Sequence, residues 1–260
     1  MKTCLKLPEY VKSALYSLSE AGYEAFLVGG SVRDLYMGKT PNDYDITTGA
    51  KPEEIISVFT GKNRIIETGI KHGTVTVMFE NNPLEITTYR IDGTYINNRK
   101  PKCVTFTPNL VHDLERRDFT VNALVYNDIC GLLDYCGGIN DIKCRIIRCI
   151  GDPTVRFNED ALRILRALRF SVKLDFDIEK NTSDAIISET PLLKNISSER
   201  IFSEIYSLFS YCGKRLCDTL IKYRQVLLSV LDIVDAPCDY EDICSKASVY
   251  TDSNMINLSY

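Results

Sequence analysis

The sequence is poor in the arrangements that build metal and disulfide frameworks. Its 260 residues include only 2 histidines, and its 10 cysteines form no Cys-x-x-Cys pair. Structural zinc sites use clustered cysteine and histidine ligands, and disulfide frameworks are typical of small secreted chains. We therefore expect neither feature. Cysteines outside such a framework are typical of a reducing compartment, which predicts a cytoplasmic protein.

Long apolar runs and a strong net charge are also lacking. Pro8, Glu9 and Lys12 interrupt the N-terminal stretch, and no apolar run approaches the roughly 18 residues of a membrane helix. The formal net charge of −4 argues against binding nucleic acid through bulk positive charge. Basic residues outnumber acidic ones between residues 143 and 173, however. We expect no membrane contact and, in that segment, either a local polyanion site or an ordinary solvated helix face.

A glycine turn follows the first apolar segment. Residues 25–28 (Ala-Phe-Leu-Val) read as a short buried strand that ends at Gly29 and Gly30, and a helix is expected from Ser31. Free backbone N–H groups at such a turn can bind a phosphate. A plain turn is the alternative, because paired glycines most often serve that purpose.

A pair of carboxylates comes next. Asp43 and Asp45 alternate with Tyr44 and Ile46, so that on a strand both carboxylates project from one face. Carboxylates held this close usually need a cation between or beside them. The turn and the pair, in this order, predict chemistry on a magnesium-bound polyphosphate, and a solvated strand end is the alternative.

These residues carry a family resemblance. The segment GGSVRD, followed by GKTPNDYDITT, resembles the opening motif of the class II tRNA nucleotidyltransferases, the CCA-adding enzymes and bacterial poly(A) polymerases of the polymerase-β-like superfamily. The resemblance covers residues 24 to about 209 in five motifs. It implies an α+β fold in which a polymerase-β-like mixed sheet, the head, precedes helical domains. It also implies nucleotide binding by Gly29, Gly30 and Arg33.

Metal ligands follow from the same resemblance. Nucleotidyl transfer uses two divalent cations, one at the attacking hydroxyl and one at the departing pyrophosphate. Asp43 and Asp45 are then catalytic ligands of two Mg²⁺ ions. Glu85, in the segment LEITTYR, is the candidate for the third catalytic carboxylate. An ordinary outward-facing strand glutamate is the alternative.

The segment RRDFTVNAL resembles the ribose-selecting motif of the family. Arg117, Asp118 and Asn122 offer donors and acceptors to the hydroxyls of a sugar. The resemblance implies that these three residues favour ribonucleotides over deoxyribonucleotides.

The segment EDALRILRALRF, on an expected helix over residues 159–170, resembles the motif that replaces a nucleic-acid template. Cytosine and adenine each present an amino donor beside a ring-nitrogen acceptor, which suits one carboxylate and one guanidinium. Asp160 and Arg163 are therefore expected to select CTP and ATP, with Arg166 and Arg169 as phosphate or base contacts. A surface ion pair is the alternative for Asp160 and Arg163.

Strand patterns dominate the first part of the chain and helical patterns the second. We expect a head domain over residues 1–150, a helical neck over 151–211 and the start of a truncated helical body over 212–260. Residues 91–102 read as a mobile loop beside the site, and residues 102–107 are expected to return to the sheet. No strand is expected after residue 153.

The predicted function is template-independent addition of CMP and AMP from CTP and ATP to the tRNA 3′ end. Residues 68–77 resemble the CCA-adding version of the family. A poly(A) polymerase or A-adding enzyme is the alternative within the family, and a catalytically weak nucleotide-binding remnant is the alternative outside it. Family members continue well past the length of this chain, so we expect weak tRNA binding.

Overall fold

The computed structural model describes residues 4–93, 95–96, 98 and 100–234. The chain forms two compact units, residues 1–93 with 102–142, and residues 94–101 with 143–260. The finer division into head, neck and body remains a prediction, and the expected body beyond residue 234 lies outside the described residues. Within the described part of the chain, no helix is long and apolar enough to cross a membrane.

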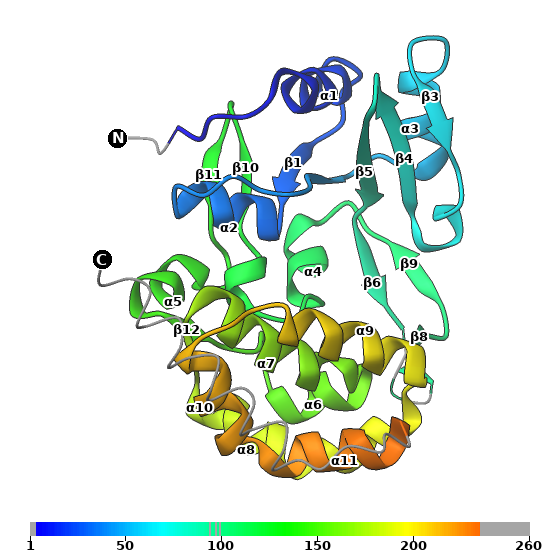
Figure 1. The fold of residues 1–260 in the computed structure, drawn as a ribbon. Helices are drawn as coiled ribbons and strands as arrows, with labels where there is room; N and C mark the ends of the chain where they lie inside the picture. Colours follow the sequence, from blue (N-terminus) through cyan, green and yellow to red (C-terminus); the bar gives the residue numbers. More distant parts are fainter. Residues whose placement is uncertain (1–3, 94, 97, 99, 235–260) are drawn as a thin grey trace. The chain divides into compact units, whose positions relative to one another are not determined.

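The first unit is built on a seven-stranded sheet with the order β11-β10-β1-β2-β5-β4-β3 (Figure 1). Neighbouring strands are antiparallel except β2 and β5, which are parallel. The predicted mixed sheet is therefore confirmed. The strands are β1 (Ala25–Val28), β2 (Asp45–Thr48), β3 (Arg64–Ile66), β4 (Thr74–Phe79), β5 (Asn82–Thr88), β10 (Val125–Asn127) and β11 (Gly131–Leu133).

Helices pack on this sheet through apolar stripes. Helix α1 buries Val11, Ala14, Leu15 and Leu18, which recur at the spacing of one helix face. It ends just before Gly22, whose φ of +88° lets the chain turn back toward β1. The helices of this part of the chain are α1 (Glu9–Glu20), α2 (Gly30–Tyr36), α3 (Pro52–Phe59), α4 (Leu110–Glu115) and α5 (Gly138–Cys144), with 3₁₀ turns at Ile70–His72 and Thr120–Asn122.

Short strands lie within and beside the segment expected as an irregular loop. β6 (Arg90–Asp92) pairs with β9 (Val104–Phe106), and β7 (Tyr95–Ile96) pairs with β8 (Lys100–Pro101). The expected return of residues 102–107 to the main sheet is therefore wrong, because β9 pairs only with β6 in a separate ladder. Strands of two or three residues are too short to show an apolar alternation in sequence.

The second unit is mainly helical. Its helices are α6 (Pro153–Glu159), α7 (Leu162–Leu174), α8 (Lys180–Glu189), α9 (Ser198–Phe209), α10 (Lys214–Lys222) and α11 (Arg224–Val234) (Figure 1). A 3₁₀ turn spans Thr190–Asn195. One of its apolar clusters joins α7, α9, α10 and α11 through Val172, Leu208, Leu216, Leu220 and Leu227. Burial of these side chains, rather than helix propensity alone, stabilises such short helices.

Two expectations for this unit are wrong. A strand does occur after residue 153, because β13 (Asp177–Ile178) pairs in parallel with β12 (Ile146–Ile147). The helix expected over residues 159–170 is two helices, since the backbone at Asp160 is extended, with φ −137° and ψ 102°. The Asp160 carboxylate accepts a hydrogen bond from the backbone N–H of Leu162 (3.2 Å), so it lies before α7 rather than on it.

Candidate active site

The predicted phosphate turn joins β1 to α2. Gly29 has φ +83°, a conformation that side chains rarely adopt, which explains the glycine at this position. A Cβ atom on Gly29 would lie 3.5 Å from Nη1 of Arg117, so the guanidinium lies against the turn. The hydroxyl of Ser31 donates to the carbonyl of Val28 (3.1 Å) and fixes the strand to the first turn of the helix.

Arg33 and Asn122 connect the glycine-turn motif to the RRDFTVNAL motif. The Arg33 side chain is buried, and its Nη1 donates to Oδ1 of Asn122. The amide of Asn122 in turn donates to Oδ1 of Asp118 (3.1 Å), which also accepts from the backbone N–H of Phe119 (2.8 Å). These predicted nucleotide-binding residues are therefore brought together, and they also brace the site.

The predicted catalytic carboxylates come from the start of β2 and from the neighbouring middle part of β5. Asp45 begins β2 and lies opposite Glu85 of β5 in the parallel register. Asp43 is exposed but precedes β2, so the expectation that both aspartates lie on one strand is wrong. The alternation of acidic residues with Tyr44 and Ile46 begins at Asp43 in the sequence, whereas the paired strand begins only at Asp45.

The Asp45 carboxyl is reached by solvent but surrounded by protein and by other acids. Desolvation raises its pKa to about 6, the charges of Asp43 and Glu85 add to the increase, and Arg117 opposes it. Mutual repulsion of this kind is relieved when a cation lies among the carboxylates. Carboxylate oxygens suit Mg²⁺, so Asp43, Asp45 and Glu85 fit the predicted metal role.

Among the described residues, no group of three or more His, Cys, Asp or Glu side chains is arranged to hold a metal ion without other ligands. Magnesium is commonly held by one or two carboxylates together with the phosphates of a substrate. The arrangement is therefore compatible with an ion that arrives with a nucleotide.

Asp113 on α4 is a site residue that the sequence analysis missed. It is fully buried, and its Oδ2 accepts from Arg117 Nη2 (3.2 Å) and from the hydroxyl of Thr47 (3.1 Å). Its Oδ1 accepts from Arg116 (2.6 and 2.9 Å) and from the backbone N–H of Arg90 (3.3 Å). Burial raises the pKa of this carboxyl, but the charges and hydrogen bonds of Arg117 and Arg116 outweigh it, so the pKa is lowered.

The predicted base-selecting residues lie in the second unit at the start of α7. Asp160 is paired with Arg200 of α9 (3.0 Å), and Arg163 is paired with Glu159 (2.7 Å). Nη1 of Arg163 also donates to the carbonyl of Arg156 (3.1 Å). Asp160 and Arg163 therefore each form an ion pair with another residue of the second unit.

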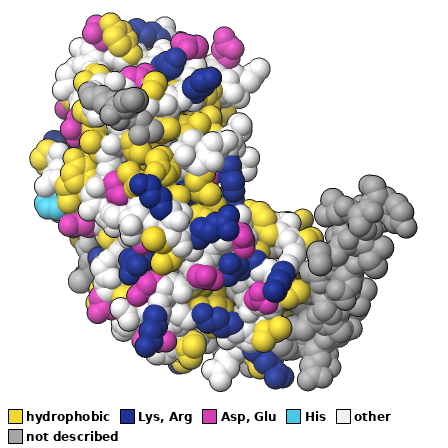
Figure 2. Space-filling model, turned by 90° about the vertical axis from the view of Figure 1, so that its left-hand side faces the viewer, with side chains coloured by type: hydrophobic (Ala, Val, Ile, Leu, Met, Phe, Trp, Pro, Cys, Tyr) yellow, Lys and Arg dark blue, Asp and Glu magenta, His cyan; other side chains and the backbone are white. Residues whose placement is uncertain are grey.

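Arg166 and Arg169 follow on α7 and share an acidic partner on α9. Arg169 Nε donates to Glu204 (2.6 Å), and Arg166 lies 3.7 Å from the same carboxylate. Both guanidinium groups also lie over the ring of Phe170. On the face drawn in Figure 2, Lys and Arg side chains are interspersed with Asp and Glu.

The β7–β8 turn contacts the start of α7. Asn98 adopts φ +51° at this turn, and its carbonyl accepts from the backbone N–H of Ala161 (3.0 Å). Its side-chain Nδ2 donates to the carbonyl of Asn158 (2.5 Å), and its side-chain Oδ1 accepts from Nδ2 of Asn195 (2.8 Å). Asn98 thus contacts residues on both sides of Asp160 within the second unit.

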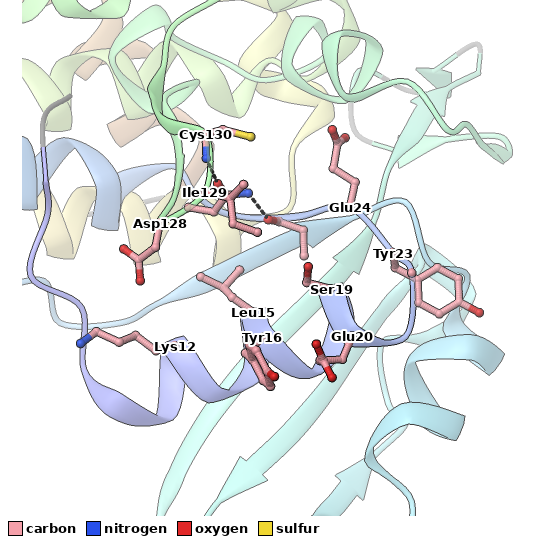
Figure 3. Close-up of a pocket in the computed structure, with 13 residues that line it drawn as sticks. Lys12, Leu15, Tyr16, Ser19, Glu20, Tyr23, Glu24, Asp128, Ile129 and Cys130 are labelled. Carbon is pink, nitrogen blue, oxygen red and sulfur yellow. Dashed lines mark hydrogen bonds between the residues drawn. The ribbon is translucent and has the colours of Figure 1, made fainter. Parts of the chain in front are cut away.

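A pocket of about 600 Å³ lies away from these residues (Figure 3). It is lined by α1, by the start of β1 at Ala25 and by the β10–β11 turn, including Asp128 and Ile129. The glycine turn follows the other end of β1. The pocket is therefore separate from the candidate active site.

Comparison with known proteins places this site in a family. Residues 25–148 match the poly A polymerase head domain, and residues 175–224 match the probable RNA and SrmB-binding site of polymerase A. The chain belongs to the poly(A) polymerase and tRNA nucleotidyltransferase family. The glycine turn, the carboxylates and Asp113 all fall within the matched head domain.

Relatives and solved structures agree with this assignment. The chain is 47% identical over 206 residues to the CCA-adding enzyme of Lactobacillus helveticus. The aligned region covers 78% of this chain and 51% of that protein. It superposes on the crystal structure of the Bacillus stearothermophilus CCA-adding enzyme in complex with CTP with a TM-score of 0.75 and 34% identity, over 86% of this chain and 58% of that one.

A further solved structure is that of a tRNA nucleotidyltransferase complexed with a primer tRNA and an incoming ATP analog. It matches with a TM-score of 0.70 and 28% identity, over 90% of this chain and 66% of that one. The chain spans about half the length of the curated relatives it matches.

Proposed function

We propose that this protein is a nucleotidyltransferase that adds CMP and AMP from CTP and ATP to the tRNA 3′ end without a nucleic-acid template. One observation carries the proposal: Asp45 and Glu85 lie side by side in the parallel register of β2 and β5, within reach of the charges of Asp43 and Arg117. The identity to CCA-adding enzymes supports the choice of substrates.

The reaction joins the 3′-hydroxyl oxygen of the RNA to the α-phosphorus of the nucleotide and releases pyrophosphate. Magnesium ions held by Asp43 and Asp45, with Glu85 beside them, would supply charge neutralisation and a more acidic attacking hydroxyl. The residues themselves orient the donor. The backbone N–H of Gly29 donates to the carbonyl of Leu124 (3.1 Å), so the N–H groups offered to phosphate oxygens are those at the start of α2, from Gly30 onward. Arg117 adds a positive charge at the same turn.

Selection of sugar and base falls to separate groups. In the proposed function Asp118 and Asn122 meet the ribose hydroxyls, while Asp160 and Arg163 meet the amino donor and ring-nitrogen acceptor of cytosine or adenine. Each of the two base-selecting groups is held by a partner, Arg200 and Glu159 respectively. A held donor or acceptor discriminates better, because a wrong base leaves it unpaired. Arg166 and Arg169 serve as phosphate or base contacts.

The direct test is incorporation of labelled CTP or ATP, with magnesium, into tRNA that lacks its CCA end. Label should enter the RNA with the wild-type protein. Asp43→Ala and Asp45→Ala should abolish incorporation while circular dichroism and thermal unfolding show a folded chain. Wild-type turnover in both variants would refute the assignment of the carboxylates.

An A-adding activity is the second candidate, because the matched head domain takes its name from poly(A) polymerase. Sequencing the RNA products separates the two. Cytidines before a terminal adenosine support the proposed function, and adenosines alone support the second candidate. Binding of nucleotide without incorporation would instead identify a binding protein.

A further inference from the structure

The fully buried Asp113 connects three parts of the first unit. Its carboxylate receives hydrogen bonds from Thr47 on β2, from Arg117 after α4 and from the backbone of Arg90 on β6. Thr47 lies two residues after Asp45 on the same strand. One carboxylate therefore ties the strand that carries a catalytic aspartate to the arginine that lies against the glycine turn.

Not every N–H donor of the Arg117 guanidinium has a hydrogen-bond partner among the described residues. Nη2 is engaged by Asp113, and Nη1 lies beside the glycine turn. Nε is buried and has no hydrogen-bond partner among the described residues. A buried guanidinium donor without a partner is costly in a folded protein, so its retention indicates that this guanidinium has a function. Nη1, which lies at the glycine turn, is the atom placed to meet a ligand there.

We propose that Asp113 is a positioning residue that fixes the Arg117 guanidinium for an anionic nucleotide. This inference rests on the proposed function. The negative charge of Asp113 is held by two arginines, so it does not repel the nucleotide as a lone carboxylate would. Its second oxygen is shared between Thr47 and Arg117, which sets the guanidinium relative to β2.

The chain offers a matched control for the loss of a buried carboxylate. Asp141 belongs to the same unit, is 3% exposed and accepts a hydrogen bond from Thr120 (2.7 Å). Asp141→Asn therefore makes the same chemical change in a similar environment without touching Arg117. We expect it to alter stability but not the affinity for CTP.

The test compares CTP binding and steady-state kinetics of wild type, Asp113→Asn, Arg117→Ala and the double variant, with thermal unfolding of each. Asp113→Asn should raise KM and Kd for CTP about tenfold, since a charge-assisted hydrogen bond is misplaced. KM for the RNA should not change. A variant that is merely less folded has a lower kcat but an unchanged KM.

The double variant gives the decisive comparison. If Asp113 acts through Arg117, then adding Asp113→Asn to Arg117→Ala should weaken CTP binding no further. Additive losses, or an unchanged KM in Asp113→Asn, would overturn the proposal. Should Asp113→Asn fail to fold, Asp113→Glu keeps the charge while displacing the guanidinium, and the same rise in KM is expected. Absence of CTP binding by the wild type would instead contradict the proposed function.

Discussion

Asp45 and Glu85 lie opposite each other on parallel neighbouring strands, and the charge of Glu85 helps to raise the pKa of Asp45. Adjacent strands are only about 4.8 Å apart, so two carboxylates in register meet at close range. Repulsion between neighbouring carboxylates lowers the free energy of unfolding. Proteins retain such pairs where the carboxylates bind a ligand, such as a cation. The predictions below follow from this and from related pairs.

Replacing Asp45 should stabilise the protein while it removes activity. The folded-state pKa of about 6 lies above the usual value of 3.8, so ionisation opposes folding above about pH 6, and this cost disappears as the pH falls toward 4. Asp45→Asn should therefore raise Tm at neutral pH and lose the advantage near pH 4. Incorporation should fall about a thousandfold or more. Lower stability together with full activity would contradict the assignment.

Removing the neighbouring charge should lower the pKa of Asp45. Asp43 raises that pKa through its charge, so Asp43→Asn should shift the titration of the Asp45 carboxyl to lower pH. A carboxyl-carbon NMR titration of the variant and the wild type measures the shift. Glu53→Gln, which removes an exposed charge from the first turn of α3, serves as the control. A titration midpoint that does not move would mean that the two aspartates do not interact.

Arg200 should control the use of Asp160 in base selection. The two side chains are 3.0 Å apart, and without Arg200 the Asp160 carboxylate would keep only its hydrogen bond from the backbone N–H of Leu162 (3.2 Å) as a restraint among the contacts described above. Arg200→Ala should reduce the preference for CTP over UTP about tenfold, the value of one charge-assisted hydrogen bond. Competition between the two nucleotides in one assay measures the ratio. The matched control is Arg215→Ala, which removes an arginine paired with Asp175 elsewhere in the same unit.

Two adjacent glycines should respond differently to substitution. A Cβ on Gly138 would lie 2.3 Å from the carbonyl oxygen of Thr120, whereas a Cβ on Gly137 meets nothing within 4 Å. Gly138→Ala should therefore cost about 2–3 kcal/mol of stability and disturb the turn that contains Asn122. Gly137→Ala should cost only about 1 kcal/mol, the strain of its φ of +80°. Denaturant unfolding of both variants makes the comparison, and equal losses would contradict it.

Local patterns predicted the elements that carry the site, but not the contacts between them. The apolar run at residues 25–28 and the glycines after it were sufficient to place β1 and its turn. The register of Asp45 with Glu85 depends on pairing across 40 residues, which no local pattern contains. The family resemblance supplied Glu85 instead.

Asp113 shows why the remainder was missed. In sequence it is one of two acids in a short helix, and acidic residues are usually solvated. Its burial depends on Thr47, which belongs to a distant strand, and on two arginines that neutralise it. The break between α6 and α7 at Asp160 was missed for a similar reason, because helix-forming residues flank it on both sides.

Asn98 should couple the β7–β8 turn to the start of α7. Its side chain and its carbonyl contact Asn158, Asn195 and Ala161, which surround the base-selecting Asp160 within the second unit. Asn98→Ala removes the two side-chain hydrogen bonds. It also replaces asparagine, which tolerates φ +51° better than most residues that have a Cβ atom. The contacts of residue 98 with the start of α7 should therefore break more often. We expect the rate of nucleotide addition to fall several-fold, with little change in Tm because the substitution removes the contacts of a single polar side chain. Asn98→Gly separates the two causes, since glycine keeps the backbone conformation but not the amide. If Asn98→Gly matches the wild type while Asn98→Ala is slow, the backbone conformation is what matters. Wild-type rates in both variants would show that the contacts of this turn do not affect the reaction.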